Sequence, residues 1–264
     1  MNKILLYIDI LGFSNLVNNK KNKLIKDLYN IIDSINAHRH DAFKTLVFSD
    51  TILVYNNFEA NNEEKKAYSV MYLIEFTKDL QNRLTKLSIF FRALIVEGEF
   101  THKKMENLDA YWGNALIKAY LNEKDIPAVG IFLEKEILKY NRIFSQSSFN
   151  DNFNFIFPTQ SLDNLESFLN GSHILSGSDI FKDPVFFDDH IDGGGYLIYE
   201  VKFLEKIYQL SHGNITEEPR IRIKYLETFR LYKEHYPKII NLLLNNNFTL
   251  LISTWTKKLN NYKN

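Results

Sequence analysis

The sequence predicts an α+β domain followed by a helical extension, and three observations support this. Short apolar runs alternate with longer stretches of helical period over the first 140 or so residues. Ser49-Asp50 joins two β-rich runs in the way that a hairpin turn does. From Pro219 onward, apolar residues recur at helical spacing, with one break at Pro237. We therefore expect one domain over residues 1–202 and a helical extension over residues 203–264.

Composition bounds the class of protein. With 264 residues, 45% of them hydrophobic, the chain can form a substantial core. The formal net charge is +0 and there is no cysteine, which argues against nucleic-acid binding and excludes thiolate metal sites. The N-terminal apolar run is too short for a signal peptide, and no window reaches the roughly 20 apolar residues of a membrane span. We expect a soluble, cytoplasmic protein that binds neither nucleic acid nor membranes.

The first predicted strand covers residues 3–9 and is apolar until it ends at Asp9. An unpaired buried charge costs several kcal/mol, so this carboxylate needs a cation, a hydrogen-bond network or a raised pKa. Gly12 would let the backbone approach a ligand closely, and Ser14 is a good N-cap. The amides of residues 10–14 are therefore candidates for holding a phosphate, while the alternative is that Asp9 only caps a turn.

A helix and a hairpin should follow this strand. Apolar residues spaced by three and four between Leu16 and Ile35 predict one amphipathic helix, closed by the basic residues 38–40. The runs 45–48 and 52–55 then meet at Ser49-Asp50. Asp50 thus becomes a second carboxylate at a strand end. Two acids on neighbouring strand ends are typical of a Mg²⁺ or Mn²⁺ site that substrate phosphates complete.

The next elements are a helix and a strand. The apolar stripe from Val70 to Leu87 predicts a core helix, and residues 88–99 predict a strand covered on both faces and interrupted by Arg92. An arginine in that position needs an anion or an acceptor. Two interpretations stay open for Arg92: contact with a nucleobase or phosphate, or an internal ion pair with Asp9 or Asp50.

The remaining elements complete an α+β order. Residues 101–110 are polar and predict a flexible flap, after which Tyr111-Trp112-Gly113 opens a helix that runs through Glu123. Residues 126–133 predict another strand. The order β, α, β-hairpin, α, β, α, β, α fits a ferredoxin-like, mostly antiparallel sheet with helices on one face.

The second half is less regular. Residues 141–183 predict an irregular insertion. The acidic, glycine-rich run 183–196 suggests a metal cluster, but hairpin chemistry leading into a strand over 196–201 is favoured. The helical tail is more apolar than a free tail should be, so it should pack on the domain or on a second subunit.

Four motifs stand in order along the chain: YIDILGFS at 7–14, FSDT at 48–51, RALIVEG at 92–98 and WGNALIKAY at 112–120. Together they resemble the motifs of class III nucleotidyl cyclase domains. More narrowly, they are similar to the pyrimidine cyclases of bacterial Pycsar anti-phage defence. The resemblance covers roughly residues 3–140, with a weaker similarity to about residue 202.

The resemblance implies that a nucleoside triphosphate is converted to its 3′,5′-cyclic monophosphate and pyrophosphate. Two Mg²⁺ or Mn²⁺ ions would be held by Asp9, Asp50 and the carbonyl of Ile10. It also implies a homodimer with sites at the subunit interface, and a product sensed by a separate effector protein in antiviral defence. The implied substrate-binding residues are Gly12, Phe13, Ser14, Phe48 and Arg92.

UTP is expected ahead of CTP. Arg92 donates hydrogen bonds, and uracil presents two carbonyl oxygens where cytosine presents one. Phe48 and the bulky residues Tyr55, Phe90 and Phe91 also suggest a pocket suited to a single ring.

One departure from the family pattern concerns the helix after the WG motif. Many members place an Asn and an Arg where this chain has Ile117 and Leu121; Asn114, Lys118 or Lys124 are possible substitutes. The alternatives are a catalytically inactive nucleotide-binding or interaction module, a purine cyclase, and a metal-dependent nuclease. The nuclease would need further acids at strand ends and a basic groove, neither of which is clear in the sequence.

Overall fold

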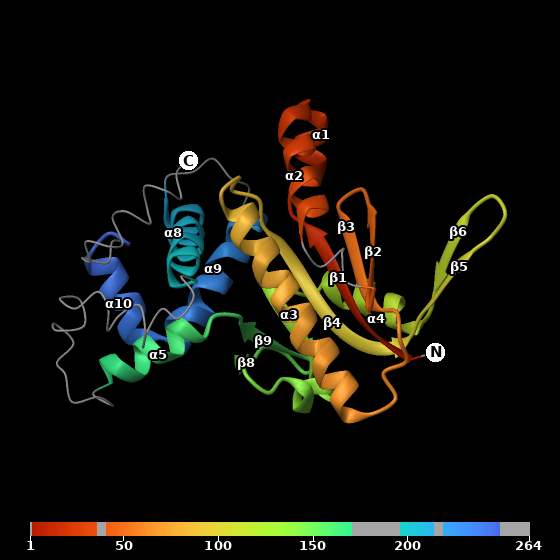
Figure 1. Cartoon of the computed structure of the whole chain (residues 1–264). Helices are drawn as coiled ribbons and strands as arrows, with labels where there is room; N and C mark the ends of the chain where they lie inside the picture. Colours follow the sequence, from red (N-terminus) through yellow and green to blue (C-terminus); the bar gives the residue numbers. More distant parts are fainter. Residues whose placement is uncertain (1, 36–40, 171–195, 214–218, 249–264) are drawn as a thin grey trace. The chain divides into compact units, whose positions relative to one another are not determined.

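The computed structural model describes residues 2–35, 41–170, 196–213 and 219–248 (Figure 1). The chain separates into two compact units, which we call the sheet unit (Met1–Pro158) and the helical unit (Thr159–Asn264). The boundary expected at residue 202 falls inside a helix, α8 (Leu197–His212). The expected helix end at residues 38–40 and the acidic run at 183–195 lie outside the described residues.

The sheet unit contains a seven-stranded sheet in the order β2-β3-β1-β4-β7-β9-β8. All neighbouring strands are antiparallel except β4 and β7, which are parallel. The α+β class and the mostly antiparallel sheet are thus confirmed. The strands are β1 (Asn2–Ile10), β2 (Phe43–Phe48), β3 (Thr51–Asn56), β4 (Phe91–Glu99), β7 (Gly130–Glu134), β8 (Ser145–Ser148) and β9 (Phe153–Phe157).

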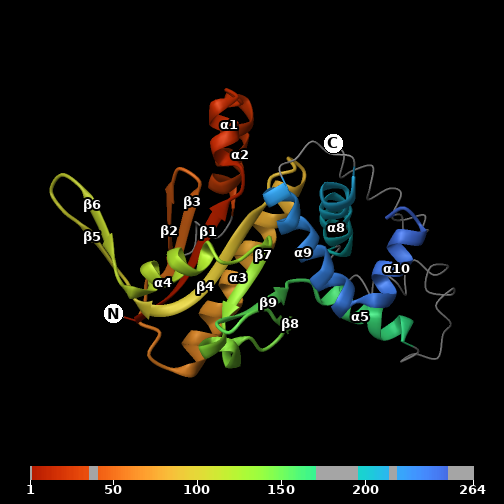
Figure 2. The ribbon, with the colours of Figure 1, turned by 180° about the vertical axis from the view of Figure 1, so that it is seen from behind.

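Helices cover both faces of this sheet, so the expectation of helices on one face is wrong. On one face, Ile4, Leu6 and Ile8 of β1 share a core cluster with α3 (Glu63–Thr85). On the other face, α4 (Asn114–Glu123) packs against β4 and β1. Figures 1 and 2, seen from opposite sides, show α3 and α4 in front of the sheet in turn. The reason is that β1 is apolar on both faces, and both must be shielded from water.

Two local predictions in the sheet unit are corrected. The single helix expected over 16–35 is broken into α1 (Phe13–Asn18) and α2 (Asn22–Ser34), with Lys20 at a φ of 52° between them. Asparagine favours turns over helix interiors, and Asn18 and Asn19 precede the break.

The flexible flap is instead a second hairpin, β5 (Thr101–Lys104) and β6 (Asp109–Trp112). His102 and Tyr111 face each other across it, with ring centroids 4.8 Å apart. Such cross-strand ring pairs stabilise a hairpin.

The segment expected to be irregular over 141–183 contains regular elements in the part that the structure describes, residues 141–170. It contains β8, β9 and the helix α5 (Gln160–Leu169), after a short 3-10 helix, η2 (Lys135–Tyr140). The hairpin β2–β3, the core helix α3 and the strand β4 are confirmed.

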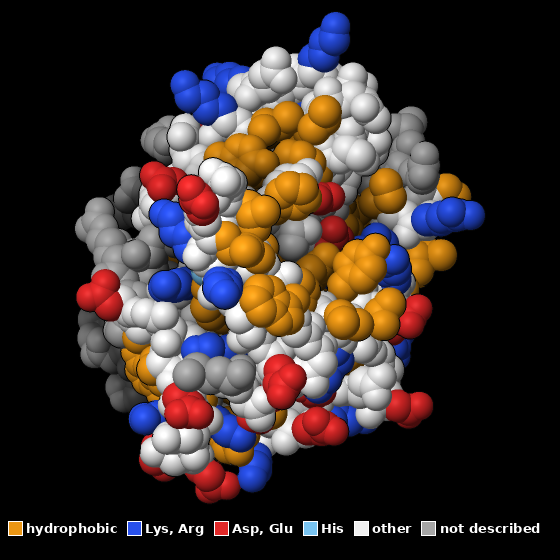
Figure 3. All heavy atoms as spheres, turned by 90° about the vertical axis from the view of Figure 1, so that its right-hand side faces the viewer, with side chains coloured by type: hydrophobic (Ala, Val, Ile, Leu, Met, Phe, Trp, Pro, Cys, Tyr) orange, Lys and Arg blue, Asp and Glu red, His pale blue; other side chains and the backbone are white. Residues whose placement is uncertain are grey.

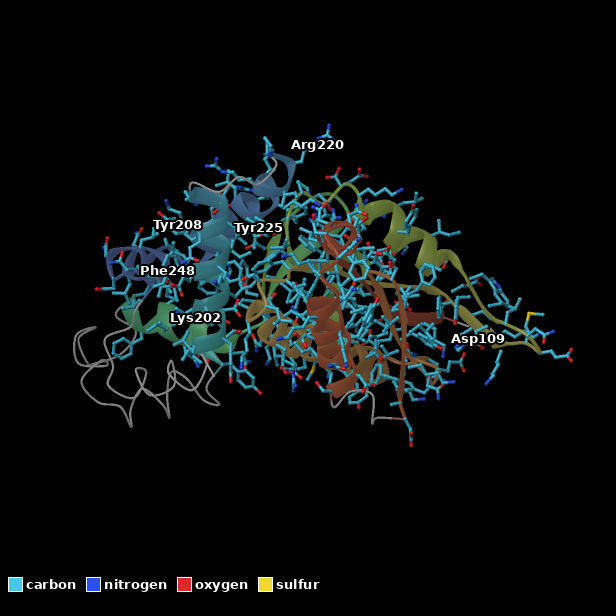
Figure 4. All side chains as sticks on the ribbon, turned by 90° about the horizontal axis from the view of Figure 1, so that it is seen from above. Asp109, Lys202, Tyr208, Arg220, Tyr225 and Phe248 are labelled. Carbon is cyan, nitrogen blue, oxygen red and sulfur yellow. The ribbon has the colours of Figure 1, made fainter. Side chains whose placement is uncertain are left out.

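The helical unit consists of α5, α8, α9 (Pro219–His235) and α10 (Pro237–Asn245) in its described part. The strand expected over 196–201 is the first part of α8, because Leu197, Val201 and Leu204 recur at helical spacing and are buried. Aromatic rings connect α8 to the turn after α10: Tyr208 and Phe248, labelled in Figure 4, have centroids 5.3 Å apart. Among the described residues, no helix is both long and apolar enough to cross a membrane.

Candidate functional site

Asp9, near the end of β1, and Asp50, in the turn before the neighbouring strand β3, lie at the same edge of the sheet. The antiparallel register pairs Asp9 with Thr51, and the Ile10 amide donates to the Asp50 carbonyl over 3.0 Å. Asp50 occupies the two-residue turn between β2 and β3, in which Ser49 has a φ of 54°. The hairpin therefore brings the second acid to the end of the first strand, as the sequence predicted.

Two tyrosines border these acids. The hydroxyl of Tyr29 on α2 donates to the Ser49 carbonyl over 2.9 Å, which ties the turn to the helix. Burial raises the pKa of Tyr29, and the charge of Asp50 adds to that effect. Burial also raises the pKa of Tyr7, with smaller contributions from the charges of both acids. Both carboxylates thus act electrostatically on Tyr7, the residue two positions before Asp9.

Arg92 lies directly opposite Asp9 on β4, and its side chain is 9% exposed. Its Nη2 contacts Asp9 Oδ2 at 2.9 Å and also forms an ion pair with Glu123. Its Nη1 donates to the carbonyls of Glu123 (2.9 Å) and Ile126 (3.1 Å). Burial lowers the pKa of Arg92, and the neighbouring Asp9 opposes this shift. Of the two interpretations left open for Arg92, the structure shows the internal ion pair.

Sequence reasoning missed Glu123. It is the last residue of α4 and is buried, although a helix end is usually where a carboxylate meets solvent. Its burial follows from the packing of α4 on β4, which places it beside the single arginine of that strand. An unpaired arginine in an apolar strand was the available signal that an additional acid would be found nearby.

The predicted phosphate cradle is smaller than expected. The amides of Ile10 and Leu11 donate to the carbonyls of Asp50 and Phe90, so residues 12–14 remain. Ser14 is not the N-cap: α1 begins at Phe13, and Gly12 is the N-cap with a φ of 71°.

Phe13 belongs to the hydrophobic core, so its backbone alone is available to a ligand. The amides at the start of a helix lack intrahelical partners, which keeps the backbone of residues 12–14 a candidate anion contact.

A pocket of about 650 Å³ opens beside the acids, within the size range of ligand sites. Phe48 lies at its rim and is 82% exposed, so it does not belong to the core. Figure 3 shows hydrophobic side chains gathered on the face of the molecule that it draws. The pocket is lined by Tyr7, Leu46, Val47, Phe48, Thr51, Leu53, Tyr111, Leu116, Ile117 and Tyr120.

Three other aromatic residues expected near this pocket do not line it. Tyr55, Phe90 and Phe91 are buried, and Tyr55 is held by a hydrogen bond of 2.7 Å between its hydroxyl and His102 Nδ1. Tyr55 lies on β3 and Phe91 on β4, with Phe90 directly before β4, and all three side chains face the interior.

The oxygen atoms at this edge suit a hard divalent cation. Asp9, Asp50 and the Ile10 carbonyl offer oxygen ligands of the kind that Mg²⁺ and Mn²⁺ prefer. In the part of the chain that the structure describes, no group of three or more acidic, histidine or cysteine side chains could hold a metal. A metal held here would take the rest of its coordination shell from water or a phosphate-bearing ligand, so the donor set fits such an ion.

Two of the residues considered as substitutes, Lys118 on α4 and Lys124 directly after it, are already engaged. Lys118 forms an ion pair with Glu134 and donates to the Glu97 carbonyl at 3.0 Å. Lys124 donates to the hydroxyl of Tyr120 at 2.9 Å. Ile117 and Leu121 are exposed instead, at 60% and 57%. This helix therefore presents apolar side chains where many class III cyclases carry polar ones.

Comparisons with known proteins found structural similarity alone: no family model and no curated protein sequence matches the chain. The chain is similar to the adenylyl cyclase CyaB from P. aeruginosa, with 11% identity and a TM-score of 0.44 over 59% of this chain and 93% of that one. It is also similar to a guanylyl cyclase domain of the RhoGC fusion protein from the aquatic fungus Blastocladiella emersonii, with 10% identity and a TM-score of 0.40 over 59% and 94%.

A bacterial light-regulated adenylyl cyclase is a third similar structure, with 12% identity and a TM-score of 0.41 over 59% of this chain and 88% of that one. These TM-scores lie below 0.5, so the residues of this chain, rather than those of its neighbours, carry the proposal that follows.

Proposed function

We propose that the sheet unit is a metal-dependent nucleotidyl cyclase that converts a pyrimidine nucleoside triphosphate, UTP ahead of CTP, to its 3′,5′-cyclic monophosphate and pyrophosphate. The observation that carries the proposal is the meeting of Asp9 and Asp50 at one sheet edge, beside an apolar pocket large enough for a nucleoside. The four motifs of the sequence support the same activity.

In this reaction the ribose 3′ oxygen forms a bond to the α-phosphorus as the bond to the β-phosphate oxygen breaks. Pyrophosphate leaves, and the proton of the 3′ hydroxyl passes to water. Asp9, Asp50 and the Ile10 carbonyl would hold the Mg²⁺ or Mn²⁺ ions, two per site. Such ions, when bound, lower the pKa of the hydroxyl and neutralise charge on the phosphates. The backbone amides of residues 12–14 would position the phosphates, and Phe48 would stack on the base.

The choice of base rests on the pocket and on the resemblance. The guanidinium of Arg92 contacts Asp9, Glu123 and two carbonyls, so the argument that Arg92 selects uracil has no support from its contacts. The preference for UTP then follows from the similarity of the motifs to pyrimidine cyclases. The same similarity supports a second-messenger role in antiviral defence, with a separate effector protein as the receiver.

We further propose a homodimer whose sites draw on both chains. Exposed apolar side chains surround the pocket, among them Phe48, Trp112, Ile117 and Leu121, which are each at least half exposed. Apolar surface of this kind is typical of an interface. Sedimentation at micromolar concentration should give a dimer, and Trp112→Asp should give an inactive monomer. A wild-type protein that is monomeric and fully active would contradict this.

The test of the activity is incubation with each of the four ribonucleoside triphosphates and Mn²⁺, with products identified by mass. Cyclic UMP should dominate when all four compete at equal concentration. Preferential conversion of ATP or GTP would contradict the pyrimidine assignment and establish the purine alternative.

A second candidate function, nucleotide binding without turnover, is favoured by the lack of a suitable charged side chain at two positions of α4. Lys118 and Lys124 are held by protein groups, and Ile117 and Leu121 cannot stabilise negative charge. Calorimetry that shows UTP binding in the presence of Mn²⁺, together with no cyclic product from any triphosphate, would establish this alternative. Both functions use the same acids and the same pocket.

A further inference from the structure

The buried carboxylate of Glu123 has no role in the proposal above, although it is joined to the site through Arg92. One guanidinium nitrogen, Nη2 of Arg92, serves both Asp9 and Glu123. The three side chains form a row that begins at the end of α4 and ends at the sheet edge. Asp9 is the member nearest to solvent, with a side chain that is 22% exposed, against 8% for Glu123.

We propose that Glu123 is a positioning residue for the metal site: by sharing the positive charge of Arg92, it leaves the carboxylate of Asp9 only partly neutralised and oriented for a divalent cation. This inference rests on the proposed function. It adds a residue that touches neither metal nor substrate and acts through Arg92 on Asp9.

The charges explain why the third member matters. Asp9 and Glu123 together carry two negative charges against the one positive charge of Arg92. With Asp50, the cluster has a net charge of −2, which attracts divalent cations. If Glu123 were neutral, the guanidinium would pair with Asp9 alone and the cluster would retain a charge of −1. The attraction for the cation would fall, and the Arg92 hydrogens would compete with it for the Asp9 oxygens.

The geometry explains why the guanidinium stays in place. Its Nη1 is held by the carbonyl of Glu123, the last residue of α4, and by that of Ile126, three residues further on. The negative end of the helix dipole lies at this terminus and favours a cation. The Glu123 carbonyl therefore holds Arg92 in place, while the Glu123 carboxylate shares the positive charge of Arg92 with Asp9. Groups that orient a metal ligand in this way typically affect metal affinity by about 10- to 100-fold.

The experiment is a titration of the full-length protein with Mn²⁺ alone, with free Mn²⁺ read by electron paramagnetic resonance. Glu123→Gln should weaken binding by about tenfold. Glu123→Asp, which keeps the charge, should stay closer to the wild type. The matched control is Glu134→Gln, because Glu134 is also buried and paired with a cation, Lys118, but has no contact with Arg92 or Asp9 among those that the structure gives it. A purely structural role of Glu123 would lower thermal stability without changing Mn²⁺ affinity.

The outcomes separate this inference from the proposed function. If Asp9→Asn loses Mn²⁺ binding while Glu123→Gln binds as the wild type does, the role of Glu123 is refuted and the metal site stands. If Asp9→Asn binds Mn²⁺ as the wild type does, the metal site fails, and the role of Glu123 fails with it.

A second measurement covers the case in which Glu123→Gln does not fold. The amide of Ile126 donates to the same Glu123 carbonyl, at 3.2 Å, as Arg92 does. Hydrogen exchange of the wild type should therefore slow around residues 123–126 when Mn²⁺ is added, and not in Asp9→Asn. Unchanged exchange in the wild type, in the presence of bound Mn²⁺, would overturn the inference.

Discussion

Each unit of the protein buries a glutamate, but the two glutamates have different surroundings. In the sheet unit, Glu123 shares a cation with Asp9, whose side chain reaches solvent. In the helical unit, Glu200 is fully buried and accepts hydrogen bonds from the hydroxyls of Tyr232 and Thr159, the latter over 3.0 Å. Burial, with the adjacent Glu200 charge, raises the pKa of Tyr232.

These surroundings distinguish a buried glutamate that serves a functional site from one that stabilises the fold. A row of buried charges that ends beside an open pocket is typical of a functional site, because the outer member can exchange its partners. A carboxylate enclosed by hydroxyl donors holds its own unit together instead. Changes at Asp9 and Asp50 should thus remove activity and spare the fold, and changes at Glu200 should do the reverse.

The largest effect is expected at the two acids. Asp9→Asn or Asp50→Asn should lower the rate of cyclic nucleotide formation by at least about 100-fold, because each removes a charged metal ligand without opening a cavity. Thermal unfolding should change little. Asp33→Asn, on the exposed surface of α2, is the matched control. Near-native activity in either site variant would show that the acids do not hold a catalytic metal.

The opposite result is expected for Glu200→Ala. Loss of the carboxylate leaves two buried hydroxyls without an acceptor and creates a cavity, which should lower the free energy of unfolding by about 2–4 kcal/mol. Activity per folded molecule should stay unchanged. Glu205→Ala on the same helix breaks a partly exposed ion pair with Lys202 and should cost less than about 1 kcal/mol. Equal losses in the two variants, measured by urea titration, would remove the contrast between the units.

How far the sequence could predict this arrangement depends on the range of the interactions. The position of Asp50 in a turn could be predicted because a two-residue loop fixes the register of its hairpin, whereas its place beside Asp9 depends on the pairing of β1 with β3. The ion pair between Arg92 and Glu123 could not be predicted, because it depends on where α4 ends relative to β4, which no local sequence pattern determines.

The misassigned elements have the same cause. The run from Tyr196 to Val201 contains residues that favour strands, yet tertiary packing makes it a helix. The exposure of Phe48 likewise could not be predicted from the sequence, since an apolar residue in a strand is usually buried.

A moderate effect is expected at the rim of the pocket. Phe48→Ala should raise KM for UTP by about tenfold, since stacking of a base on an aromatic ring contributes about 1–3 kcal/mol. Because Phe48 is 82% exposed, stability should change by less than about 0.5 kcal/mol. Ile223→Ala, at an exposed apolar residue of the helical unit, is the control and should leave KM unchanged. An unchanged KM in Phe48→Ala would place the base elsewhere.

The smallest effect concerns pH and the helical unit. Burial lowers the pKa of His235 from 6.5, although Asp163 and Glu166 partly oppose the shift. The unfolded chain then binds a proton to His235 more readily than the folded chain does. The contribution of His235 to the free energy of unfolding should therefore be fully present above pH 6.5 and should be lost as the pH falls through the folded pKa. Urea titrations at several pH values should show this loss, and His235→Gln should reduce it. The opposite result would be a free energy of unfolding that increases as the pH is lowered through this range in the wild type but not in His235→Gln. That result would contradict the lowered pKa assigned to His235.

The most direct test of a metal site at Asp9 and Asp50 is a crystal structure with Mn²⁺ and a non-cleavable UTP analogue, in which anomalous scattering locates the metal. We predict anomalous density between the carboxylates of Asp9 and Asp50, within reach of the Ile10 carbonyl, with the base beside Phe48. Density at another location, with analogue bound and Asp9 still paired with Arg92, would contradict the assignment of this sheet edge as the metal site.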